Sequence, residues 1–227
     1  MSGEIVRHHL VVPRTARYLT RGPTSGPVRD VWFLLHGYGQ LAEQFLIECE
    51  ALAAPDRLLV ACEGQSRFYL DSLRSGPAAA RRVGASWMTR EDRLTEITDY
   101  VRALDVIYGD VLARISVPVS RINVLAFSQG TSTACRWLAR GDARVGRLVL
   151  WAGEVPPDLD LSEARPRLAA MDVLLVAGTR DDFITPKILE RETSRLAAAE
   201  IGYAVRRFEG AHAVDGELLR AIGKGEG

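Results

Sequence analysis

The chain has 227 residues, a size that single α/β domains commonly reach, so we expect one domain over residues 1–227. Hydrophobic residues make up 47% of the chain and charged residues 26%, which is typical of a globular protein with a well-filled core. The 29 basic residues balance the 29 acidic ones. This zero formal charge excludes a general nucleic-acid binder and an electrostatic membrane anchor.

The cysteines and the N-terminus indicate the compartment. Cys49, Cys62 and Cys135 show no paired metal-ligand spacing, so we expect buried free thiols in a reducing environment and no metal site. The N-terminal segment carries Glu4 and Arg7 and has no sustained apolar core, so it is not a secretory signal. No apolar run is long enough to span a bilayer. We therefore expect a cytoplasmic protein.

The first part of the chain reads as strands around one helix. Two strands are expected at residues 5–12 and 16–20. Strands are also expected at 28–36, where residues 31–35 are consecutively apolar, and at 58–62, and such runs are typical of a parallel sheet covered on both faces. A helix over about 42–54 separates them, with apolar residues at helical spacing.

Residues 63–88 are the least regular part of the chain, and such a stretch in a compact domain is more often functional than idle. The sequence from Thr89 to Asp92 resembles a capping box and predicts the start of a long helix. Apolar residues from Leu94 to Val111 recur along that helix, and we interpret their stripe as core.

The second half alternates strands and helices. We expect strands at 121–127, 147–151, 173–177 and 203–208, with helices at 131–139, at 186–199 and at the C-terminus. Thr185 and Pro186 read as the cap and first residue of the 186–199 helix. This alternation predicts an α/β fold with a mostly parallel central sheet and helices on both faces. Working residues in such sheets lie beyond the carboxyl ends of the strands.

Ser128 lies at one of those ends, between a strand and a helix. Small residues flank it two positions before and after, at Ala126 and Gly130, which is typical of a nucleophile elbow. The usual pattern has glycine at the first of these positions, and alanine adds one methyl group. The elbow lifts the hydroxyl above the sheet, where N–H groups at the start of the following helix face it.

A serine hydroxyl needs a base to take its proton and a carboxylate to orient the base. His212 follows the last strand and Asp181 follows the strand before it, so the order Ser128, Asp181, His212 is that of α/β-hydrolases. Spacing alone leaves Asp182 open as the carboxylate, whereas Asp172 precedes its strand and lies at the wrong end. The backbone N–H groups of Gln129 and Tyr38 are the expected oxyanion donors.

These pieces together resemble the phospholipase/carboxylesterase branch of the α/β-hydrolases, which also holds the acyl-protein thioesterases. The matching segments are Leu35-His36-Gly37-Tyr38-Gly39, Ala126-Phe127-Ser128-Gln129-Gly130, Gly178-Thr179-Arg180-Asp181 with Pro186, Gly210-Ala211-His212, and Trp87. The resemblance implies an α/β-hydrolase fold and a serine esterase with Ser128, Asp181 and His212 as triad. The chain departs from the family at Ala126 and in an extra residue between Asp181 and Pro186, which makes protein deacylation the weaker inference.

The substrate side is less defined. Only residues 152–171 separate two strands, too few for a multi-helix lid, so we expect an open site without a large lid. Aromatic and apolar residues available for an acyl wall are Tyr38, Phe68, Tyr69, Leu70, Trp87 and Phe183, for which ordinary packing is an equal interpretation. Whether Arg74, Arg81 and Arg82 contact substrate stays open, because a solvated charged loop explains them as well.

The sequence therefore predicts a serine carboxylesterase that hydrolyses short- to medium-chain carboxylic esters through an acyl-serine, without cofactor. A lysophospholipase or acyl-thioesterase with the same triad is the enzymatic alternative, and a catalytically silent hydrolase-fold binding protein is the non-enzymatic one. The expected partner is a small-molecule ester, with no nucleic acid and no membrane span. A homodimer is compatible with the sequence, which does not decide the oligomeric state.

Overall fold

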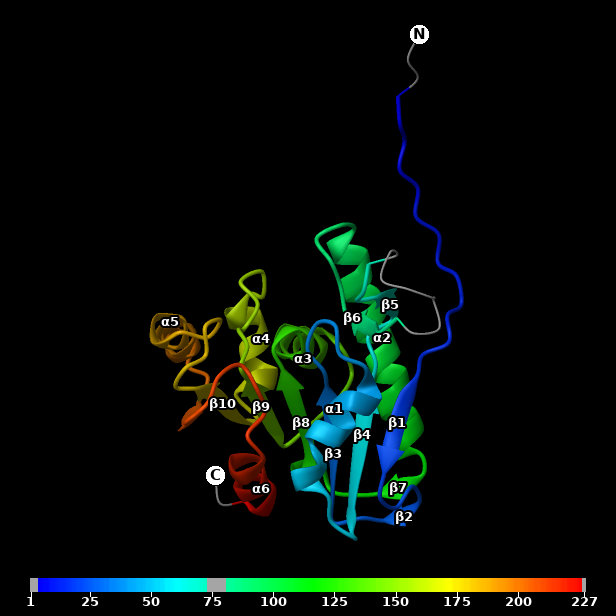
Figure 1. The fold of residues 1–227 in the computed structure, drawn as a ribbon. Coiled ribbons are helices and arrows are strands. Elements are labelled where there is room, and N and C mark those ends of the chain that lie inside the picture. Colours follow the sequence, from blue (N-terminus) through cyan, green and yellow to red (C-terminus); the bar gives the residue numbers. More distant parts are fainter. Residues whose placement is uncertain (1–3, 73–80, 226–227) are drawn as a thin grey trace.

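A computed structural model of the chain describes residues 4–72 and 81–225. Its centre is a seven-stranded sheet in the order β1-β4-β3-β8-β9-β10-β11 (Figure 1). The edge strand β1 pairs antiparallel with β4, and every other pairing in this sheet is parallel. The strands are β1 (Tyr18–Arg21), β3 (Asp30–Leu35), β4 (Arg57–Cys62), β8 (Ile122–Phe127), β9 (Arg147–Trp151), β10 (Asp172–Gly178) and β11 (Ala204–Phe208). The predicted mostly parallel sheet is confirmed.

Helices cover both faces of this sheet, as predicted (Figure 1). One face packs against α2 (Arg93–Leu112), α3 (Gln129–Arg140), α4 (Leu161–Leu168) and α5 (Pro186–Ala198). The other packs against α1 (Ala42–Glu48), the short helix η1 (Glu50–Leu52) and α6 (Gly216–Lys224). Alternate residues of each strand enter the two core layers because side chains along a strand point to opposite faces.

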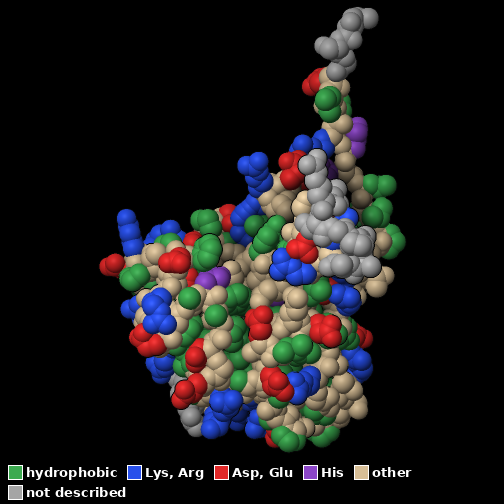
Figure 2. Space-filling view, in the orientation of Figure 1, with side chains coloured by type: hydrophobic (Ala, Val, Ile, Leu, Met, Phe, Trp, Pro, Cys, Tyr) green, Lys and Arg blue, Asp and Glu red, His purple; other side chains and the backbone are tan. Residues whose placement is uncertain are grey.

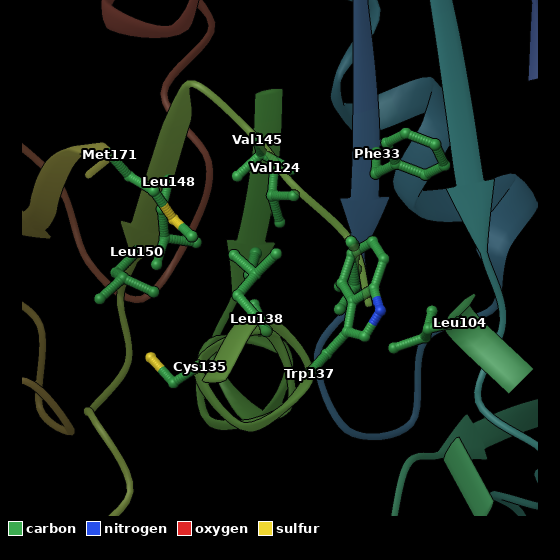
Figure 3. Close-up of a cluster of buried hydrophobic side chains, with 14 of the residues drawn as sticks. Phe33, Leu104, Val124, Cys135, Trp137, Leu138, Val145, Leu148, Leu150 and Met171 are labelled. Atoms are coloured by element: carbon green, nitrogen blue, oxygen red, sulfur yellow. The ribbon is translucent and has the colours of Figure 1, made fainter. Parts of the chain in front are cut away.

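The larger core layer lies between the sheet and α3. Figure 3 shows Trp137 and Leu138 of α3 beneath Val124 of β8, with Leu148 of β9 beside it. The indole Nε1–H of Trp137 donates to Asp105 Oδ1 at 2.8 Å, so this buried polar group is satisfied. The tight packing of α3 on the sheet fixes the position of the helix N-terminus, which lies directly after Ser128.

The N-terminal segment differs from the prediction. Residues 5–12 form no strand, and the chain runs from the N-terminus, which lies far from the sheet in Figure 1, to Arg17, which bonds Glu63 just before β1 begins. Ile5 and Leu10 are 97% and 87% exposed. The contacts of this segment include the ion pairs of Arg7 with Glu91 and of His9 with Asp92. High β-propensity alone does not make a strand, because a strand needs a partner ladder.

Two predicted helices form with different limits. The helix expected over 42–54 is divided into α1 and η1. The capping box at residues 89–92 does not form: α2 begins at Arg93, and Thr89 instead bonds the side chain of Glu96. Leu94 is 71% exposed, whereas Ile97 and Leu104 are buried. Leu94 lies outside the core stripe because it belongs to the first turn of α2, at its solvent-facing end.

The irregular stretch at 63–88 contains a small hairpin, made of β5 (Ser66–Tyr69) and β6 (Val83–Ser86). Backbone bonds in both directions between Ala85 and the segment Gly39-Gln40 attach the hairpin to the loop after β3. A Cβ on Gly84 would lie 2.3 Å from the carbonyl oxygen of Gly39, so glycine is needed for this close approach. A two-residue pair, β2 (Gly26–Pro27) with β7 (Ile115–Ser116), and the short helix η3 (Val119–Arg121) complete the fold.

A buried carboxylate anchors the start of this stretch. Glu63 accepts hydrogen bonds from Arg17, from Arg67 and from the N–H of Ala42. Burial alone would raise the pKa of Glu63, but the hydrogen bonds from the two arginines outweigh it and leave the pKa lowered. The ionised side chain therefore joins the segment before β1, the hairpin and the start of α1.

Other expectations are also met within the described residues. Residues 152–171 contain one eight-residue helix, α4, so no multi-helix lid covers the sheet. The three cysteines are buried free thiols. Thr185 caps α5 through Ile188 N, with Pro186 as the first helical residue. In the part of the chain that the structure describes, no helix is long and apolar enough to cross a membrane.

Asp158 secures the loop between β9 and α4. Its carboxylate accepts two hydrogen bonds from the buried guanidinium of Arg136 and one from Arg93. Burial alone would raise the pKa of Asp158, but the bonds from Arg136 outweigh it and lower the pKa to about 2. The folded state therefore binds this proton more weakly than the unfolded chain, and the pair stabilises the fold above the reference value of ~3.9.

We expect Asp158→Asn to lower the free energy of unfolding by about 2 kcal/mol at pH 7, less than for a fully buried pair because Asp158 is partly exposed. The loss should shrink as the pH falls from ~4 toward 2, where Asp158 of the wild type becomes protonated. Urea unfolding across this range measures it. The exposed Asp172–Arg147 pair supplies the control Asp172→Asn, expected to have a smaller effect. A loss that is constant with pH would contradict the assignment.

Candidate active site

Ser128 stands on a strained turn between β8 and α3. Its φ of 52° and ψ of −116° are rare for a residue with a side chain, and such strain is typical of functional turns. The N–H of Ser128 donates to Trp151 O at 2.9 Å, which ties the turn to β9. A Cβ on Gly130 would lie 2.3 Å from Leu35 O, so glycine is required where α3 meets β3. Ala126 is fully buried on β8, where its methyl group packs in the core.

His212 and Asp181 converge on this serine from two other loops. His212, after β11, places Nε2 2.9 Å from Ser128 Oγ. Its Nδ1 lies 2.9 Å from Asp181 Oδ2, after β10. A carboxylate only accepts hydrogen bonds, so Nδ1 carries the proton and the bare Nε2 accepts from the serine hydroxyl. The three side chains thus form one continuous hydrogen-bonded series.

The structure distinguishes the two aspartates that spacing left open. Asp181 is 5% exposed, and its Oδ1 also accepts the N–H groups of Phe183 and Ile184. Asp182 is exposed to solvent. Two backbone donors therefore hold the Asp181 carboxylate toward His212. Asp172 lies at the start of β10, at the opposite end of the sheet from Ser128, as expected.

Aromatic rings hold the imidazole of His212. Phe127 and Phe183 lie on it with ring centroids 5.0 and 4.7 Å away. The next residue is fixed as well, because Trp151 Nε1 donates to Ala213 O at 2.9 Å. These contacts leave the His212 side chain 23% exposed.

The loop after β3 lies against the serine. A Cβ on Gly37 would be 3.2 Å from Ser128 Cβ, so the following peptide, which carries the N–H of Tyr38, borders Ser128. Among the described residues, no backbone hydrogen bond outside the regular elements is donated by Tyr38 or by Gln129, the two predicted oxyanion donors. Gln129 is also the first residue of α3, where N–H groups have no partner within the helix.

The side chain of Gln129 has a separate role that spacing did not reveal. It accepts from Trp87 N at 3.2 Å and donates to Ser86 Oγ and Met88 O. The residue after Ser128 thus binds the end of the hairpin. The hairpin in turn bonds the loop at Gly39, so both predicted oxyanion segments belong to one hydrogen-bonded unit.

Trp87 does not belong to an open substrate wall. It is 3% exposed, its ring stacks on His36 at 4.9 Å, and its Nε1 donates to His36 O at 2.8 Å. The reason is its position directly after β6, which turns the indole into the core. Trp87 therefore supports the loop after β3 from beneath.

The other residues expected in the wall lie at the surface around the site. Tyr38 and Phe183 are 61% and 66% exposed, and Tyr38 packs on Phe68 with ring centroids 5.2 Å apart. Tyr69 and Leu70 are exposed on the hairpin. Figure 2 shows hydrophobic side chains at the surface on the upper part of the body, beside a histidine. Of these residues, Phe183 lies against the imidazole of His212.

The three arginines near the hairpin are only partly described. Arg74 lies outside the described residues. Arg81 lies over the ring of Tyr69 at 5.6 Å, and Arg82 pairs with Asp71.

Within the described residues, no group of three or more His, Cys, Asp or Glu side chains is arranged to hold a metal ion.

The sheet, its covering helices and the loops at its carboxyl edge define the α/β-hydrolase fold, and three comparisons with solved structures agree. Esterase PE8 is 19% identical, with a TM-score of 0.68 over 93% of this chain and 97% of that one. Acyl-protein thioesterase 2 of Zea mays is 17% identical, with a TM-score of 0.67 over 93% and 98%. The Bacillus cereus carboxylesterase is 15% identical, with a TM-score of 0.63 over 92% of each chain.

The resemblance to the phospholipase/carboxylesterase branch is thus confirmed as a likeness of fold across nearly the whole chain. No protein-family model matches the sequence, and no curated protein matches it.

If Asp181 orients His212, Asp181→Asn should slow the labelling of Ser128 by a fluorophosphonate about 10³-fold or more, because the amide favours the wrong imidazole tautomer. The adjacent, exposed Asp182→Asn is the matched control and should react at the rate of the wild type. Second-order labelling rates, followed by intact-protein mass spectrometry, give the comparison. Equal rates in the two variants would remove Asp181 from this role.

Proposed function

We propose that the protein is a serine carboxylesterase that hydrolyses short- to medium-chain carboxylic esters through an acyl-serine intermediate. The observation that carries the proposal is the continuous series from Ser128 Oγ through His212 to Asp181, at the carboxyl edge of the sheet. A serine, a base and a buried carboxylate in this geometry supply what acyl transfer to a hydroxyl needs.

In the first half of the reaction, Ser128 Oγ attacks the ester carbonyl carbon while its proton passes to His212 Nε2. The ester C=O becomes an oxyanion, which the N–H groups of Tyr38 and Gln129 stabilise. The tetrahedral intermediate then collapses, the bond to the alkoxy oxygen breaks, and His212 returns its proton to the departing alcohol. Ser128 is left acylated, and Asp181 stabilises the imidazolium that forms in passing.

The second half repeats these steps with water. Water gives a proton to His212 Nε2 and attacks the acyl carbon, and the same N–H groups stabilise the second oxyanion. Collapse releases the carboxylic acid and restores the Ser128 hydroxyl with the proton held by His212. The 23% exposure of His212 supports access of water to this position.

The surroundings of the triad support a small or medium acyl group. Tyr38, Phe68, Tyr69, Leu70 and Phe183 would provide an apolar wall beside Ser128. The segment between β9 and β10 contains one short helix, so it supplies no multi-helix lid to enclose a long acyl chain. Each added methylene that contacts this wall should make binding of the acyl chain more favourable by up to ~0.8 kcal/mol. Methylenes beyond the end of the wall should add nothing.

p-Nitrophenyl esters from acetate to dodecanoate test the proposal. We expect kcat/KM to rise with acyl length among the short esters and to decline before dodecanoate, because the additional methylenes of the longest acyl chain have no apolar side chains to contact. Ser128→Ala should reduce turnover to background, since it removes the nucleophile. The absence of Ser128-dependent turnover on every ester would refute the esterase assignment.

Two further measurements distinguish the alternatives. A fluorophosphonate labels an activated Ser128 but leaves a catalytically silent binding protein unmodified. Matched oxygen esters and thioesters of the same acyl group separate an esterase from an acyl-thioesterase, and lysophosphatidylcholine tests for a lysophospholipase. Preference for the thioester or the lysolipid would keep the triad and change the substrate class.

A further inference from the structure

His36 is a buried polar residue that the proposed mechanism does not use. It is fully buried directly after β3, and both ring nitrogens have hydrogen-bond partners. Its Nε2 lies 2.9 Å from the N–H of Gly64, and its Nδ1 lies 2.7 Å from the carbonyl oxygen of Gly37. An ordered imidazole against the loop that borders Ser128 suggests a function in that loop.

The partners of His36 determine its protonation. Gly64 N–H can only donate, so Nε2 must be bare, and Gly37 C=O can only accept, so Nδ1 must carry the proton. A charged imidazole would turn an Nε2–H against the N–H of Gly64. Burial lowers the pKa of His36, against smaller opposing contributions from the bond to Gly37 and the charge of Glu63. The side chain is therefore a neutral, directed donor to Gly37 O.

Hydrogen bonds hold the first peptide group around Gly37 at both ends and the second at its carbonyl. In the first, His36 O accepts from Trp87 Nε1, and Gly37 N–H donates to Gln40 Oε1 at 2.7 Å. In the second, Gly37 O accepts from His36 Nδ1 and, at 3.3 Å, from Gln40 N. The peptide bonds of the described chain are all trans, so the C=O of Gly37 and the N–H of Tyr38 point in opposite directions. Holding the carbonyl therefore directs the N–H.

We propose that His36 is a positioning residue that holds the Gly37–Tyr38 peptide, so that Tyr38 N–H is presented to the carbonyl oxygen of a substrate at Ser128. The inference rests on the proposed function, because it assigns Tyr38 N–H to the oxyanion. Gly37 allows this peptide to turn easily, since it has no side chain. Without the bond from His36, the plane could rotate and withdraw the donor. Loss of one oxyanion donor typically lowers kcat by about 10²-fold or more.

Two substitutions of His36 separate positioning from packing. Asparagine carries its amide nitrogen where histidine carries Nδ1, so His36→Asn retains a donor for Gly37 O. Glutamine carries its amide oxygen near the position of Nε2, so His36→Gln retains the acceptor for Gly64 and loses the donor. Both replace the ring that stacks on Trp87, so both should lose stability to a similar extent.

We expect His36→Gln to lower kcat on the best p-nitrophenyl ester about 100-fold with KM nearly unchanged, and His36→Asn to stay within about tenfold of the wild type. Rates are normalised to the fraction of protein that a fluorophosphonate titrates. An alkyl trifluoromethyl ketone, which forms an oxyanion on the serine, should bind His36→Gln about 100-fold more weakly. Gln44→Ala, on the exposed side of α1, is the control with unchanged kcat.

Equal loss in the two His36 variants, or kcat of folded His36→Gln within threefold of the wild type, would overturn the inference. So would a trifluoromethyl ketone affinity that does not follow kcat. The ¹⁵N spectrum of the wild-type imidazole gives a test that needs neither variant nor turnover. A neutral ring protonated at Nδ1 at pH 7 supports the proposal, and protonation at Nε2 refutes it. Failure of the esterase proposal would appear separately, as absent Ser128-dependent turnover in the wild type.

Discussion

The site depends on one steric constraint, the contact between the first turn of α3 and the end of β3. Gly130 leaves no room for a side chain beside Leu35 O, so the helix starts directly against the strand. This contact brings Ser128 and Gln129 next to the loop that follows β3. Two segments about 90 positions apart in sequence thereby become neighbours. The positive φ of Ser128 is the local strain that accompanies this packing, and the core around Trp137 holds the helix in place.

Around this contact, hydrogen bonds join the loops into one rigid rim. The Gln129 side chain forms a hydrogen bond with the end of the hairpin, and the hairpin forms hydrogen bonds with the loop at Gly39. Glu63, just before the hairpin, accepts a hydrogen bond from the start of α1. Preorganised donors act because they need no rearrangement when charge develops. A site made of loops gains that property here from the hydrogen bonds between the loops.

Much of this could be predicted from the sequence. The apolar runs and the alternation of strands and helices predicted the parallel sheet, because strands buried on both faces are almost continuously apolar in sequence. The order of Ser128, Asp181 and His212 placed three side chains at one edge. Local patterns could not separate Asp181 from Asp182, since that choice depends on which carboxylate the turn points inward. They also misplaced the segment at residues 5–12, whose pairing depends on a partner strand.

The buried polar contacts were beyond sequence reasoning for a related reason. The side chains of His36, Gln40 and Trp87 act on backbone groups, and no residue pattern specifies which carbonyl or N–H a side chain will meet. For Trp87 the sequence left a substrate wall and ordinary packing equally open, and the structure shows the indole buried after the hairpin. The only signal was the density of polar and aromatic residues in a segment with glycines, which marks a functional region without assigning roles.

The turn after β10 has a consequence for how this site can vary. The Asp181 carboxylate is secured by the N–H groups of Phe183 and Ile184, while Thr185 and Pro186 begin α5 on their own. The Asp181 carboxylate and the start of α5 are thus held by separate hydrogen bonds. The side chains of residues 182–184 take part in none of these bonds. A residue inserted after Ile184 would lengthen the turn before α5 and leave the bonds to the Asp181 carboxylate in place.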